Sequence, residues 1–191
     1  MNECIDNLIH RGRHNVYKAF RILRAKTINY DKQIIEQIKM ILSSLGDEYE
    51  VMVQSALNDE LRFLPLKERD FLKHIRAPER DLWDKVLMEF YRNAGYDYTD
   101  LSDPDSIDVM LNFMEILTQD TVIDFEKYNT NSGIKKLLIQ SRFIGSHLMP
   151  FLTSCVEKYP NSAYLKLVHT FIKEDMTLLN DCLRLLLKDN R

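Results

Sequence analysis

Acidic side chains recur at helical spacing in the stretch 98–117, where Asp105, Asp108 and Glu115 would share one side of a helix. The opposite side of that helix would carry the apolar residues Ile107, Met110, Leu111, Met114 and Leu117. A carboxylate binds the planar guanidinium of arginine through two parallel hydrogen bonds. The stretch therefore predicts a helix that is buried on one face and able to bind a cationic partner on the other.

The start of this helix has a capping signal of its own. Asp103 could accept hydrogen bonds from the free N–H groups of the first turn, and Pro104 would then occupy the first helical position. Asp105 would place negative charge at the positive end of the helix dipole. Capping alone is a sufficient explanation of both aspartates, so a binding role and a purely structural role stay open.

Aromatic residues and one histidine accompany the acidic stretch. Trp83, Tyr91 and Tyr98 lie in or near a polar connection at 95–104, where they could provide the apolar part of a groove or simply belong to the core. His147 could contact a ligand or satisfy a buried hydrogen bond. The basic residues Arg11, Arg13 and His14 predict an exposed helix face.

The sequence lacks the motifs of the common enzyme classes. It contains no glycine-rich phosphate loop, no HExxH and no GxSxG. The three cysteines, Cys4, Cys155 and Cys182, have no CxxC spacing, which argues against a zinc site or a disulfide framework. The formal net charge of −3 argues against binding to nucleic acid. We therefore expect a protein that is not an enzyme and has no cofactor or bound metal, located in the cytoplasm without stable membrane insertion.

Helical periodicity runs through most of the 191 residues, and no segment shows the alternation of a strand. The pattern predicts an all-α fold, a single compact helical domain of residues 1–191 with roughly eight to ten helices. The connection at 95–104 could act as a hinge between two helical halves. Pro150 should kink the long segment 134–159 or begin a new helix there.

Two motifs resemble landmarks of a known family. The segment LSDPDSIDVMLNFMEIL (101–117) is similar to the Pro-Asp-His signature of the TorD/DmsD/NarJ redox-enzyme maturation chaperones, and QSRFIGSHLMPFLTSCVE (140–157) resembles their Phe-x-x-x-His-Leu segment. Pro104, Asp105 and His147 match the family pattern, whereas Ser106 stands where the family has histidine. The flanks RHNVYKAFRILRA and SAYLKLVHTFIKEDMTLL look like the first and the closing helix of the family.

This resemblance implies a TorD-like, all-helical cytoplasmic chaperone. Such a protein binds the twin-arginine signal peptide of a client subunit, the apo-form of a molybdopterin oxidoreductase, and delays its export until the molybdenum cofactor is inserted. The residues expected to bind the peptide are Trp83, Tyr91, Tyr98, Asp103, Pro104, Asp105, Ser106, Asp108, Glu115 and His147. The alternative is a helical adaptor that docks on the folded partner subunit without reading a leader. Both a monomer and a domain-swapped dimer remain open.

Overall fold

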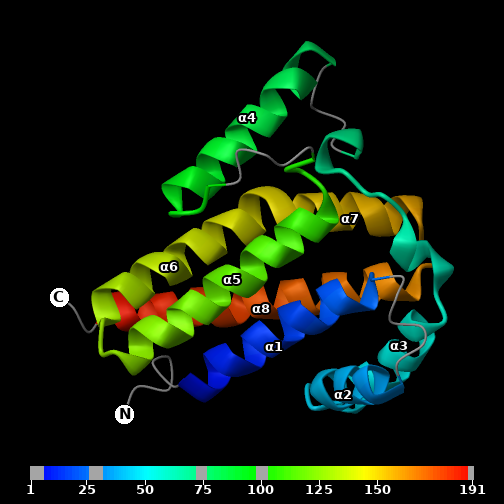
Figure 1. Cartoon of the computed structure of the whole chain (residues 1–191), viewed down its shortest axis with the longest axis horizontal. Coiled ribbons are helices and arrows are strands. Elements are labelled where there is room, and N and C mark those ends of the chain that lie inside the picture. Colours follow the sequence, from blue (N-terminus) through cyan, green and yellow to red (C-terminus); the bar gives the residue numbers. More distant parts are fainter. Residues whose placement is uncertain (1–6, 26–31, 72–76, 98–102, 189–191) are drawn as a thin grey trace.

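The computed structural model describes residues 7–25, 32–71, 77–97 and 103–188 (Figure 1). Its α-helices are α1 (Asn7–Leu23), α2 (Lys32–Ser43), α3 (Asp47–Leu57), α4 (Ala77–Asn93), α5 (Ile107–Glu126), α6 (Thr130–Phe143), α7 (Met149–Lys158) and α8 (Ala163–Lys188). Two short 3-10 helices, Glu60–Phe63 and Glu68–Asp70, connect α3 to α4. The predicted all-α class is confirmed for the described residues, which contain no strand.

The expected number of helices, eight to ten, is too high. A π-helical turn, Ile144–Leu148, joins α6 to α7 without a break, so the described residues form seven separate helices. In this turn the N–H of Met149 donates to the oxygen of Ile144, one residue further back than in an α-helix. Pro150 follows in the first turn of α7, where its missing N–H and its ring are tolerated. The wider π turn accommodates the proline, and the helix continues into α7.

Helix α5 occupies the middle of the fold, with α1 on one side and α6 on the other (Figure 1). Helix α8 packs against α6, α7 and α3, and α2 lies outside α3. The buried residues of α5, most of them apolar, form one broad face of the helix, as expected of a helix that packs against several others. Phe113 of α5 has ring-centroid separations of 4.7 Å from both Tyr91 of α4 and Phe143 of α6. These rings attach α4 to the rest of the core.

Helix α5 begins later than the sequence suggested, and its cap is Ser106. The Ser106 hydroxyl accepts the N–H of Val109 at 3.3 Å, while Pro104 and Asp105 lie in the turn before the helix. The expectation that Asp103 caps the helix and that Pro104 is its first residue is wrong. The reason lies in tertiary structure, because the backbone of 105–107 pairs with that of 66–68: the N–H of Glu68 donates to the oxygen of Asp105 at 2.9 Å, and the N–H of Ile107 donates to Leu66 at 3.0 Å.

The proposed hinge at 95–104 includes residues 98–102, which lie outside the described part of the chain. Tyr98, one of the predicted peptide-binding residues, falls in this gap as well. The interpretation of 95–104 as a hinge therefore stays a prediction.

Candidate functional site

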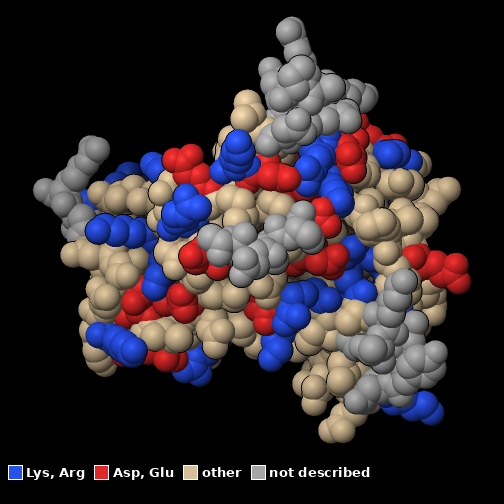
Figure 2. Space-filling view, turned by 45° about the horizontal axis from the view of Figure 1, so that its top comes forward, with Lys and Arg blue, Asp and Glu red and all other residues tan. Residues whose placement is uncertain are grey.

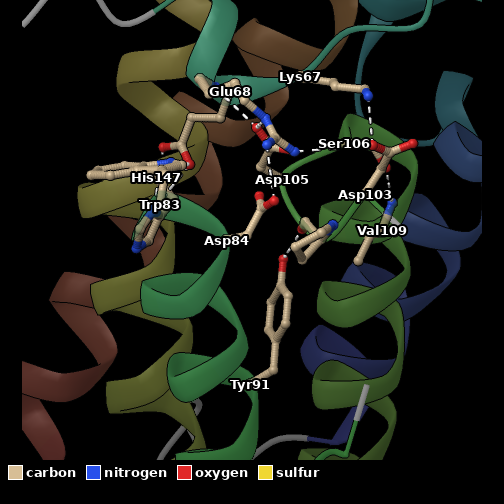
Figure 3. A network of polar contacts seen from close by, with 12 residues as sticks. Lys67, Glu68, Trp83, Asp84, Tyr91, Asp103, Asp105, Ser106, Val109 and His147 are labelled. Carbon is tan, nitrogen blue, oxygen red and sulfur yellow. Dashed lines mark hydrogen bonds and ion pairs between the residues drawn. The ribbon is translucent and has the colours of Figure 1, made fainter. Parts of the chain in front are cut away.

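Four carboxylates gather where the 3-10 helix Glu68–Asp70 meets the start of α5 and the first half of α4 (Figure 3). We call Glu68, Asp84, Asp103 and Asp105 the carboxylate cluster. The cations among them are Lys67 and Arg69. Even if His147, which adjoins Glu68, is counted as a third cation, the four carboxylates outnumber the cations. The cluster therefore retains an excess of negative charge.

Arg69 is the central cation of the cluster. Its Nε and Nη2 donate to the two oxygens of Asp105 at 2.8 and 2.7 Å, and its Nη1 donates to Asp84 Oδ2 at 2.9 Å. Asp105 also accepts the backbone N–H of Arg69 at 3.1 Å and is fully buried. The hydrogen bonds that Arg69 donates to Asp105 raise the pKa of Arg69, which keeps the guanidinium charged. The aspartate matched to the family motif is therefore already bound to an arginine of its own chain.

Asp103 lies at the solvent edge of the same cluster. Lys67 Nζ donates to its Oδ1 at 2.5 Å, and Arg69 Nη2 lies 4.0 Å from the same oxygen. The side chain of Asp103 remains 40% exposed, in contrast to that of Asp105. A cation from outside could approach Asp103 without displacing buried atoms.

Asp84 has an unused acceptor. Its Oδ2 binds Arg69, but its Oδ1 is buried and has no hydrogen-bond donor in the described part of the chain. Burial raises the pKa of Asp84, and Arg69 opposes that shift. A second guanidinium would supply the missing donor and stabilise the charge. Two residues of α4 near Asp84 in sequence, Leu82 and Val86, expose apolar side chains to solvent.

His147, Trp83 and Glu68 form a second, more deeply buried group. The Trp83 indole donates to Glu68 Oε2 at 2.7 Å, and His147 Nδ1 lies 3.2 Å from both Glu68 oxygens. Glu68 is fully buried and His147 is nearly so. The π turn directs His147 from the α6–α7 side toward this carboxylate (Figure 3). These contacts fix α4 against the π turn, so His147 satisfies a buried polar contact, one of the two roles expected for it.

Tyr91 belongs to the core, the other role that the sequence left open for it. Its hydroxyl donates to the backbone oxygen of Pro104 at 2.8 Å, and no part of the residue reaches solvent. Tyr91 therefore joins α4 to the turn that precedes α5. A peptide would not reach its ring without a movement of α4.

Asp108 and Glu115 are turned away from the cluster, toward α1. Arg24 binds both oxygens of Asp108 at 2.6 and 3.0 Å, and Arg21 Nε donates to Glu115 at 2.5 Å. The expected acidic face of α5 is thus paired with the basic side of α1 and is not free. Figure 2 shows acidic and basic side chains interspersed over the face that it presents.

Arg13, which the sequence predicts on an exposed basic face, lies instead in a second buried network. Arg13 is only 4% exposed, and it donates to the two oxygens of Asp175 at 2.5 and 3.0 Å and to Gln140 at 2.6 Å. The Tyr17 hydroxyl donates to Asp175 at 2.7 Å. Helices α1, α6 and α8 are therefore joined by a charged network inside the core.

The structure brings together six of the predicted site residues at one end of α5: Trp83, Tyr91, Asp103, Pro104, Asp105 and His147. Ser106 caps α5 next to them, while Asp108 and Glu115 lie elsewhere. The sequence interpretation did not single out Lys67, Glu68, Arg69 or Asp84. A signal existed for the first three, since residues 67–70 are four consecutive charged residues after an apolar connection. No sequence signal distinguishes Asp84 from the other charged residues of α4.

Neither a metal site nor a membrane-spanning helix occurs among the described residues. Across the described ranges, no three His, Cys, Asp or Glu side chains are grouped as ligands of a metal ion would be. No helix within those same ranges is long and apolar enough to cross a membrane.

Comparison of the chain with models of protein families and with curated proteins gave no match. The resemblance to the TorD/DmsD/NarJ chaperones therefore rests on the sequence motifs alone.

Proposed function

We propose that this protein is a non-enzymatic, cytoplasmic chaperone that binds the twin-arginine leader of a molybdenum-cofactor oxidoreductase subunit. In this proposal, binding delays export of the client until its cofactor has been inserted. The motif resemblance supplies the client class, and the structure adds a site with suitable chemistry. The observation that carries the proposal is the carboxylate cluster, whose negative charge exceeds that of its own cations.

The contacts of the cluster suggest how a leader would bind. A twin-arginine leader combines two adjacent guanidinium groups with an apolar segment. Asp103 is partly exposed and open to an incoming guanidinium, whereas Asp84 Oδ1 lacks a donor among the described residues but is buried, so a guanidinium would reach it only after the side chains around it move. Leu82 and Val86 on α4 are about half exposed, but they lie two positions to either side of Asp84 and therefore on another face of the helix.

This proposal changes the roles of several residues expected at the site. Asp105 holds Arg69 in place and so positions the cluster, whereas Asp108 and Glu115 hold α1 against α5. Trp83 and His147 determine where α4 lies relative to the π turn. A leader would therefore meet Asp103 directly and Asp84 only after a local movement, and the other residues would act through packing.

A second candidate function is a helical adaptor that docks on the folded partner subunit. The pairing of Asp105, Asp108 and Glu115 within the chain favours it, because these carboxylates are not free to receive a leader. Co-purification with a client that lacks its leader separates the two functions. The adaptor would retain that client, and the leader-binding chaperone would lose it.

The direct experiment is a calorimetric titration of the purified protein with a synthetic twin-arginine leader and with a version in which both arginines are lysine. Because only guanidinium can bind a carboxylate through a bidentate fork, we expect the arginine leader to bind about tenfold more tightly. Equal affinity for the two leaders, or no binding of either, would refute the proposal.

A further inference from the structure

Helices α2 and α3 form a hairpin at the edge of the molecule, away from α4 (Figure 1). An open groove of about 690 Å³ runs along this hairpin, with Met40 on the α2 side and Val51 on the α3 side. The carboxylate cluster contributes no residue to its lining. The groove is thus a separate surface feature.

Of the three apolar residues that line this groove, Val53 belongs to the core, whereas Met40 and Val51 are not needed by the fold. Helix α2 packs on the core through Ile38 and Leu42, which are almost completely buried. Met40 and Val51, by contrast, are 70% and 71% exposed. Two exposed apolar side chains on adjacent helices, with polar residues around them, form a surface that can bind another molecule.

The charge around the groove is negative. Glu36 and Glu50 both line it, and the one lysine in the lining, Lys39, donates to Glu36 at 2.9 Å. Glu50 has no ion-pair partner in the part of the chain that the structure describes. One carboxylate is therefore left to interact with a cation from outside.

We infer that the α2–α3 groove binds a cationic amphipathic helix of a partner protein. The apolar face of that helix covers Met40 and Val51, and its lysine or arginine side chains reach Glu50 and the outer side of Glu36. This is the helix-in-groove mode of recognition, in which apolar residues one turn apart anchor the ligand. The inference does not depend on leader binding at the carboxylate cluster.

Other occupants fit the charge less well. In a symmetric dimer formed through this groove, each Glu50 would approach the negative rim of the other copy. An anionic lipid surface or a nucleic acid would meet the same repulsion. A cationic helix is the ligand whose charge and apolar face both complement the groove.

Fluorescence anisotropy with a labelled model peptide tests the inference. The probe is an amphipathic helix of leucine and lysine, about four turns long, and its control carries glutamate in place of every lysine. We expect the lysine peptide to bind and the glutamate peptide not to bind. Val51→Lys and Glu50→Lys should each weaken binding about tenfold or more, because the first removes an apolar anchor and the second reverses the charge.

The matched controls are Leu185→Lys on α8 and Glu157→Lys on α7, which make the same changes at exposed positions outside the groove. Both should bind the lysine peptide as the wild-type protein does. Circular dichroism checks that each variant is folded; if Val51→Lys is not, Glu50→Lys decides. Equal binding of the two peptides, no binding of either, unchanged binding by the folded groove variants, or equal weakening by the controls would overturn the inference.

Discussion

Replacing Asp105 by asparagine should destabilise the protein strongly, even though the change keeps the shape of the side chain. Asp105 is fully buried, receives two hydrogen bonds from the Arg69 guanidinium and accepts a third from the Arg69 backbone. Asparagine removes the charge and turns an N–H₂ group toward a donor. Breaking a buried ion pair by changing one partner costs about 3–5 kcal/mol. In this variant Arg69 would still pair with Asp84, and its side chain is partly exposed to solvent. We therefore expect the lower end of this range, about 3 kcal/mol.

Urea unfolding followed by circular dichroism measures this loss, and for a chain of this size it corresponds to a fall in Tm of about 6–12 °C. The control is Asp181→Asn on α8, where the carboxylate is 56% exposed and its partner Arg184 is exposed as well. That change should cost less than about 1 kcal/mol. If Asp105→Asn were no more destabilising than Asp181→Asn, the structural role assigned to Asp105 would be wrong.

Three further predictions concern other parts of the fold. Asp175→Asn should lower the free energy of unfolding by about 3 kcal/mol or more, measured by urea unfolding, because Arg13 would remain buried without its counter-charge; a loss below about 1 kcal/mol would contradict this. Ser106→Ala should cost about 1 kcal/mol by removing the cap of α5, while Asp103→Ala should not produce a capping loss of that size, and the same assay distinguishes them. The thiol of Cys155 should not react with a thiol-specific reagent in the folded protein at pH 8, because burial raises its pKa to about 12; rapid native labelling, located by mass spectrometry, would refute this.

The sequence was sufficient to predict the helical class and the buried face of α5. Ile107, Met110 and Leu111 repeat at helical spacing, and each is fully buried as that spacing requires. The continuous passage from α6 into α7 was not predictable in the same way. Pro150 alone indicates a break or a kink, and only the π turn before it allows the chain to continue.

The site was harder to predict because its contacts join distant parts of the chain. Asp103 and Pro104 carry a local capping signal. Because the backbone of 105–107 pairs with that of 66–68, however, the cap of α5 is Ser106 and the helix begins at Ile107. Periodicity placed Asp105 on the polar face of the helix, whereas Asp105 is buried in the turn before α5, and periodicity could not reveal that Arg69, 36 residues earlier, would bind it. Arg13 shows the same limit, since an arginine near the N-terminus has no local sign of burial against Asp175.

The most direct test of the proposed function compares the two leaders on the wild-type protein and on Asp84→Asn. The quantity is the ratio of affinities for the arginine leader and the lysine leader, measured by calorimetric titration, with Asp181→Asn on α8 as an exposed control. If a leader guanidinium binds the free oxygen of Asp84, the ratio should be about ten in the wild-type protein and in Asp181→Asn, and it should fall toward one in Asp84→Asn. A ratio of one in the wild-type protein, or a ratio that Asp84→Asn leaves unchanged, would contradict this account.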